Sequence, residues 1–228
     1  MEFTAIARRF GITCAAATVI LVAVYAVTLV VGLLSLESQD DPIGDPMFTI
    51  LEVLIMVMMP AIVGLMIAVH AFAPTRMKAL TLTAVVFMGL LAGLTLSIHF
   101  VILTVSREPE FAGQQWLPLV LEFEWPSVVY ALDILGWDAF FALSMLFAAP
   151  AFQGSRLAGW IRWLMVTSGV LALAGLSGVA FGDMHLRNIG IVGYVPVFLV
   201  VAVLLGVLFH RTTPSDGPPV SESLSGQR

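Results

Sequence analysis

Six apolar stretches, each long enough to cross a lipid bilayer as a helix, dominate this sequence. A helix needs roughly 20 apolar residues to cross about 30 Å of hydrocarbon, and it satisfies its own backbone hydrogen bonds there. The pattern therefore predicts an all-α fold, a polytopic membrane bundle of about six transmembrane helices. The expected spans cover about residues 12–36, 48–72, 79–105, 126–152, 160–182 and 188–209.

The composition agrees with a chain whose main partner is the lipid bilayer. Of 228 residues, 60% are hydrophobic and 11% are charged, whereas a soluble domain is about half apolar and a quarter charged. The few basic residues are scattered and form no patch suited to nucleic acid. The single cysteine, Cys14, excludes an intramolecular disulfide and a CxxC redox pair.

The first apolar stretch is expected to remain as a span rather than to be cleaved as a signal peptide. It exceeds the roughly 7–15 residues of a signal h-region, and no small-x-small site follows it. We expect residues 1–211 to form a single transmembrane bundle domain. Residues 212–228, rich in Pro, Ser and Gly, are expected to form a disordered cytoplasmic tail.

The charges of the connecting segments predict the orientation. One set of span ends carries most of the basic residues, and the opposite segments 37–45 and 106–125 are acidic. By the positive-inside rule, both termini are cytoplasmic, which suits the plasma membrane or an inner cell membrane. The basic residues that define this side are Arg8, Arg9, Arg76, Lys78, Arg156, Arg162 and Arg211. Within the opposite segments, residues 116–125 are too few to span; they lie along the membrane surface or fold over the bundle as a lid.

Ionisable groups inside the spans are the strongest functional signal, because a charge at the bilayer centre costs about 2.5–3.5 kcal/mol even on the lenient insertion scale. They gather toward the non-cytoplasmic end, together with a short polar loop at 183–188. Tyr130 and Trp137 flank Asp133 on its helix face. The candidate ligand-binding residues are Glu52, His99, Tyr130, Asp133, Trp137, Asp138, Asp183, His185 and Arg187.

The two aspartates of the fourth span are expected to face different directions. Asp133 and Asp138 are five residues apart, which places them roughly 140° from each other on an α-helix. They are then unable to share one tight site. Asp138 is expected to contact a neighbouring helix instead, through hydroxyls such as those of Thr167 or Ser168.

Each candidate also has a structural interpretation. Asp133 or Asp138 can be a protonated strut between helices, Glu52 can be solvated near the surface, and His99 can be a hydrogen-bonded core residue. Residues 183–187 can form a solvated loop. Met runs such as 56–59 are typical core filler, and Gly89 with Gly93 forms a GxxxG pair that we interpret as helix packing.

No motif identifies a reaction, a cofactor or a substrate. His and acid residues lack the spacing of a metal site, so no metal is predicted, and neither a bis-histidine haem nor a copper site is predicted. The leading hypothesis is binding, transport or sensing of a small polar or amphipathic molecule in an outward-facing cavity. The alternatives are an intramembrane enzyme acting on a lipid or lipid-linked substrate, and an accessory structural subunit; a homo-oligomer stays open.

The orientation can be tested by labelling single cysteines in a Cys14-free background. A cysteine at Ser38 should react with an impermeant thiol reagent added to intact cells, and one at Thr75 should react only after permeabilisation. Labelling of Thr75 from outside would contradict the predicted orientation.

Overall fold

The computed structural model describes residues 3–38 and 43–214, and every regular element in these ranges is helical. The predicted all-α membrane bundle is confirmed: six segments of the described chain are long and apolar enough to span a bilayer. They are Ala5–Leu34, Met47–Phe72, Thr75–Arg107, Val128–Ala151, Arg156–Phe181 and Met184–Arg211.

The first three spans are nearly continuous helices. They are α1 (Ala5–Leu34), α2 (Met47–Phe72) with Pro60 inside it, and α3 (Lys78–Leu103), which follows the short turn η1 (Thr75–Met77). The third span ends with the 3₁₀ turn η2 (Val105–Arg107), and a second 3₁₀ turn and a short helix connect it to the fourth: η3 (Pro109–Phe111) and α4 (Leu117–Leu121).

The last three spans are built from several pieces. The fourth comprises α5 (Val128–Ile134), the π-helical segment η4 (Leu135–Phe141), α6 (Ala142–Ala148) and η5 (Ala149–Ala151). The fifth comprises α7 (Arg156–Gly175) and α8 (Ser177–Phe181). The sixth comprises α9 (Met184–Val192), the π-helical segment η6 (Gly193–Val197) and α10 (Phe198–Arg211).

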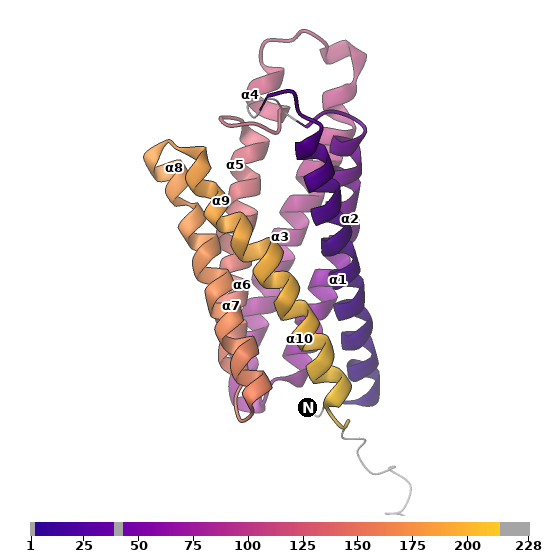
Figure 1. The fold of residues 1–228 in the computed structure, drawn as a ribbon, viewed down its shortest axis with the longest axis vertical. Coiled ribbons are helices and arrows are strands. Elements are labelled where there is room, and N and C mark those ends of the chain that lie inside the picture. Colours follow the sequence, from indigo (N-terminus) through magenta and orange to yellow (C-terminus); the bar gives the residue numbers. More distant parts are fainter. Residues whose placement is uncertain (1–2, 39–42, 215–228) are drawn as a thin grey trace, which may run out of the picture.

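The six spans pack in a ring that follows the order of the chain. Helix α1 packs on α2, α2 on α3, α3 on α6 and η4, α6 on α7, and α7 on α9 and α10, while α10 closes the ring against α1. Figure 1 shows the start of α1 and the end of α10 at one end of the molecule, here named the termini end, and α4 at the other, the α4 end. Helices α1 and α9 diverge toward the α4 end (Figure 1). Which end faces the cytoplasm stays a prediction.

Aromatic packing closes the ring at the termini end. The rings of Phe3 and Phe72 meet edge to face at 5.5 Å between centroids, and Phe72 also contacts Phe152 and Phe209. Arg8 adds hydrogen bonds to the last carbonyls of α10, at 3.0 Å to Phe209 O and 2.6 Å to His210 O. Packing of four phenylalanine rings and a cation at a helix C-terminus both favour close contact of the helices here.

The segment around α4 folds over the bundle as a lid. The sequence allowed this arrangement or one along the membrane surface. Leu121 is buried and forms a small core with Ile98, Ile102 and Val129. The ring of Phe123 lies 5.5 Å from that of His99 and 5.1 Å from that of Tyr130. The lid therefore covers polar residues of α3 and α5.

The GxxxG pair was interpreted as packing, but a Cβ added at Gly89 or Gly93 would meet no atom of the described chain within 4 Å. That interpretation is wrong within this bundle, since both glycines face its outside. The predicted tail falls largely in residues 215–228, outside the described residues.

Candidate functional site

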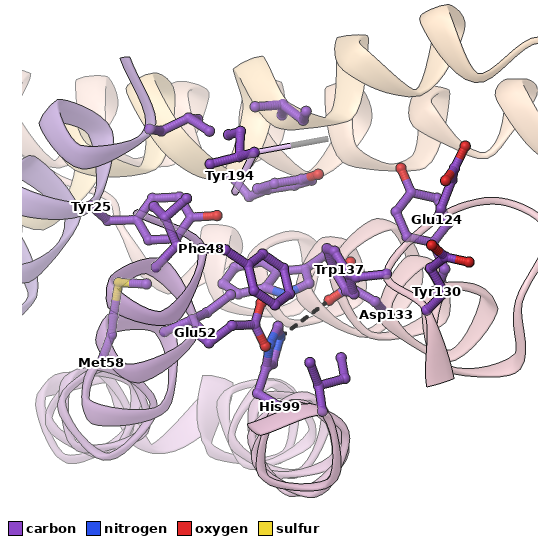
Figure 2. Close-up of a pocket in the computed structure, with 18 of the residues that line it drawn as sticks. Tyr25, Phe48, Glu52, Met58, His99, Glu124, Tyr130, Asp133, Trp137 and Tyr194 are labelled. Carbon is purple, nitrogen blue, oxygen red and sulfur yellow. Dashed lines mark hydrogen bonds and ion pairs between the residues drawn. The ribbon is translucent and has the colours of Figure 1, made fainter. Parts of the chain in front are cut away.

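A cavity of about 600 Å³ occupies the α4 half of the bundle. Residues of α1, α2, α3, α5, η4, α9 and η6 line its sides, and residues 117–124 form its cover. Its deep wall is apolar and includes Ile55, Met58 and Ile62 of α2. Its other walls carry charged and aromatic groups, several of which point toward one another in Figure 2.

His99 lies between two carboxylates that come from different helices. Its Nδ1 is 2.6 Å from Oε2 of Glu52, and its Nε2 is 3.7 Å from Oδ1 of Asp133. All three residues are less than a twentieth exposed and all line the cavity. The short bond to Glu52 fixes the ring plane and ties α3 to α2.

Arg187 is the buried cation of the cavity wall, and each of its three side-chain nitrogens donates to a protein oxygen. The bonds reach Oδ2 of Asp133 at 2.7 Å, Oδ2 of Asp138 at 3.3 Å and the Tyr130 hydroxyl at 2.8 Å. Its guanidinium carbon also lies 4.6 Å from the centre of the Tyr130 ring. These contacts join α9 to α5 and η4. Glu52, His99, Tyr130, Asp133, Asp138 and Arg187 are named the polar cluster.

The expectation that Asp133 and Asp138 face different directions is wrong, because the helix between them is not an α-helix. Both carboxylates bind the same guanidinium. The π-helical segment η4 starts directly after α5, and a π turn pairs residue i with i+5 rather than i+4. Residues five apart then lie one above the other, so the 140° separation of an ideal α-helix does not apply.

Asp138 contacts neighbouring helices as expected, but its hydrogen bond comes from Arg187 of α9 and not from the hydroxyl of Thr167 or Ser168. The Ser168 hydroxyl donates to the carbonyl of Gly193 at 2.8 Å. The Asp138 carboxylate instead occupies the space next to Gly175 of α7 and Gly190 of α9, where an added Cβ at either position would collide with its Oδ1. Two glycines thus make room for one buried carboxylate.

The remaining sequence-predicted residues divide into two groups. Trp137 is buried and lines the cavity, with its ring 5.1 Å from that of Tyr194. Asp183 and His185 are exposed and lie outside the cavity lining. Asp183 caps α9 by accepting a hydrogen bond from the His185 backbone N–H, so its contact is that of a helix cap.

Aromatic residues of the cavity escaped the sequence reasoning. Tyr25, Tyr194, Phe48 and Phe123 all line it, and Figure 2 shows Tyr25 and Tyr194 across from Glu52 and Trp137. A signal did exist for the tyrosines: the chain has only three, and all three line this cavity. Tyrosine inside a span needs a polar partner for its hydroxyl, as an ionisable side chain does.

The geometry around His99 does not resemble a metal centre. The two nitrogens of an imidazole point in opposite directions, so Glu52 and Asp133 lie on opposite sides of the ring and cannot bind one ion together with it. Across the described ranges, no group of three His, Cys, Asp or Glu residues is arranged to hold a metal.

A second charged contact lies where the connecting segments meet the α4 ends of α2 and α3. Arg107 donates to the Thr49 hydroxyl at 2.8 Å and lies 3.4 Å from Asp45. Hydrogen bonds from the side chain and backbone of Thr49 lower the pKa of the Asp45 carboxyl below its usual range. These exposed residues join the start of α2 to the end of the third span beside the lid.

The space around Asp138 predicts a difference between two glycines. Gly190→Ala should destabilise the protein by about 1–3 kcal/mol, because the new methyl group collides with the Asp138 carboxylate. Gly89→Ala, a helical glycine with open space around it, is the matched control and should be neutral. Unfolding titrations with SDS in mixed micelles measure both, and equal stability of the two variants would contradict the placement of Asp138.

The pairing of Arg187 predicts a large loss of stability when the cation is removed. Arg187→Met should cost about 3–5 kcal/mol, because two buried carboxylates lose their counter-charge. Arg107→Met removes an exposed guanidinium and should leave the same unfolding midpoint unchanged within error. A mild effect of Arg187→Met would mean that the two aspartates are held by other groups.

Comparison of the chain with protein-family models, with curated proteins and with solved structures finds no match. The chemistry of the cavity is therefore what indicates a function.

Proposed function

We propose that this protein binds a small amphipathic molecule in the cavity at the α4 end, for transport across the membrane or for sensing. The observation that carries the proposal is the convergence of charged residues from α2, α3, the fourth span and α9 on one cavity of about 600 Å³. Small-molecule sites generally have volumes of roughly 300–1,000 Å³, apolar walls and a few convergent polar groups.

The two parts of the cavity suit the two parts of an amphipathic ligand. Ile55, Met58 and Ile62 offer an apolar surface deep in the bundle, and the polar cluster lies nearer the lid. Burial of an apolar chain contributes roughly 25 cal/mol per Å² removed from water. The polar cluster then determines which head group is accepted.

The arrangement of the helices supports entry from the membrane side at the α4 end. Residues of α1 and α9 both line the cavity, yet these helices diverge toward the lid (Figure 1). At the termini end, the Phe3, Phe72, Phe152 and Phe209 cluster closes the ring. With the orientation predicted from the basic residues, the cavity faces the outer leaflet.

The convergence also weighs against a purely structural role. In an accessory subunit without a site, ionisable residues are expected as single struts on separate helix interfaces. Here Glu52, His99, Asp133 and Arg187 form one continuous set of contacts on a cavity wall. Buried polar groups gathered on a cavity are a physical reason to expect binding.

One observation favours an enzyme as the second candidate function. Glu52 holds the Nδ1 edge of His99, and the Nε2 edge is directed away from it, toward Asp133. An imidazole oriented by a carboxylate is a common general base. An enzyme acting on a lipid-linked substrate would release an altered amphiphile, whereas a carrier or sensor would release it unchanged.

Occupancy of the cavity can be measured through Trp137, which is buried in its wall. We expect saturable quenching of Trp137 by octanol brominated on its terminal carbon, because bromine quenches only at close contact. The measurement uses a variant that keeps Trp137 as its sole tryptophan, in uncharged maltoside detergent. The residues changed to Phe for this purpose are Trp116, Trp125, Trp160 and Trp163.

Two matched pairs of substitutions provide the control. Ile55→Phe with Ile191→Phe fills the cavity and should weaken quenching by about tenfold or more, a loss of ~1.4 kcal/mol. Val57→Phe with Val192→Phe places the same two aromatic side chains at exposed positions of the same helices and should leave quenching unchanged. Linear, unsaturable quenching that is equal in both variants would overturn the proposed function.

A further inference from the structure

Two buried polar atoms of the cavity wall, one on His99 and one on Asp133, face each other without a hydrogen bond between them. Nε2 of His99 and Oδ1 of Asp133 are 3.7 Å apart, which is too far for a hydrogen bond. Both atoms are buried, and neither has a hydrogen-bond partner among the described residues. An unpaired buried polar atom costs about 1–3 kcal/mol, so this pair favours an incoming donor.

The contacts on the other side of each group determine what this donor has to be. A carboxylate only accepts, so Nδ1 of His99 carries the hydrogen of its 2.6 Å bond to Glu52. In the neutral ring Nε2 is then a lone pair. Oδ2 of Asp133 already accepts from Arg187, which leaves Oδ1 for the ligand. A group with two N–H bonds satisfies both acceptors together.

The charges of the cavity favour a donor that is also a cation. Arg187 is matched against two carboxylates, Asp133 and Asp138. Glu52 adds a third acid to the wall, and Glu122 and Glu124 add two more at the lid. An anionic head would meet these carboxylates, and three of the five N–H donors of Arg187 are already bonded to protein oxygens. At low dielectric this like-charge contact is strongly unfavourable.

The aromatic walls add to the same preference. Tyr25, Trp137 and Tyr194 surround the polar cluster together with Phe48. The face of an aromatic ring attracts a desolvated cation by up to about 2 kcal/mol, and several rings around one cavity are the usual setting for ammonium recognition.

We infer that the ligand is an alkyl ammonium: a protonated amine whose N–H groups bind Asp133 Oδ1 and His99 Nε2, and whose apolar body lies along α2. This inference rests on the proposed function and adds the charge and donor chemistry of the ligand. A preference for a cationic N–H donor distinguishes this cavity from binding sites for fatty acids, phospholipid phosphates and neutral alcohols.

The test is competition between matched eight-carbon amphiphiles and the brominated octanol, read as recovery of Trp137 fluorescence in the sole-Trp137 protein. The competitors are octylammonium, octyltrimethylammonium, octanol and octanoate. Octylammonium should bind at least about tenfold more tightly than octanol and more tightly still than octanoate. Octyltrimethylammonium carries the charge but no N–H, so it should be weaker than octylammonium.

Variants then assign the preference to the polar cluster. Asp133→Asn, and independently Glu52→Gln, should remove most of the advantage of octylammonium over octanol, about tenfold in the ratio of their dissociation constants. Glu108→Gln is the control, since Glu108 is an exposed acid outside the cavity lining, and it should keep the wild-type ratio. The ratio in the sole-Trp137 protein without further substitution tests the inference even if one variant fails to fold.

The outcomes separate the two proposals. Saturable quenching by brominated octanol, with octanoate binding as tightly as octylammonium, would overturn the ammonium inference and leave the proposed function standing. An ammonium preference that persists in both Asp133→Asn and Glu52→Gln would also overturn it. Absence of saturable quenching in the sole-Trp137 protein without further substitution would overturn both.

Discussion

The rest of this structure depends on the burial of one guanidinium between two carboxylates. A charge inside hydrocarbon is tolerated only when it is paired and hydrogen-bonded, and Arg187 meets that condition through Asp133, Asp138 and Tyr130. Two departures from regular helical packing accompany this pairing. The fourth span takes a π turn that places residues five apart on one face, and α7 and α9 approach Asp138 through glycines.

The same pairing positions the cavity. It holds α9 against the fourth span and α7 at the α4 end, while at the termini end α10 returns to α1 and is bonded by Arg8. The sixth span therefore lies close to α1 at one end and away from it at the other (Figure 1). The volume between them is lined by Val22 and Tyr25 on one side and Ile191 and Tyr194 on the other. A bundle of apolar helices alone would be expected to close this space, since packing is the main attraction between helices in lipid.

Sequence reasoning reached the spans and part of the site because both follow from the cost of polarity in hydrocarbon. Apolar length located the six helices, and the same cost singled out Glu52, His99 and Asp133 before any fold was known. Arg187 was a candidate only as part of the polar loop expected at 183–188, whereas the structure includes it in α9. It predicted the wrong direction for the Asp138 side chain, because a helical wheel assumes 100° per residue and no local sequence feature indicates a π turn. It failed for Tyr25 and Tyr194, which are not ionised and so were not counted. It gave equal weight to Asp183 and His185, although a residue just beyond a span end can serve as a cap as easily as a ligand.

Some polar atoms of the polar cluster are hydrogen-bonded and others are not, and this difference indicates what the cluster is for. A structural strut is most stabilising when every buried polar atom is satisfied, and a half-satisfied network is less stable than an apolar core. Glu52, Tyr130 and the Arg187 nitrogens are bonded within the protein. Four buried side-chain atoms of the described chain have no hydrogen-bond partner. Two of them, His99 Nε2 and Asp133 Oδ1, belong to residues of the cavity wall. The others are Asp138 Oδ1, which lies behind this wall, and the Thr18 hydroxyl, which lies elsewhere. Local departures from full satisfaction are expected at functional sites rather than in supporting structure. Within the cluster, two of the three unpaired atoms face the cavity, which is where an incoming ligand can reach them.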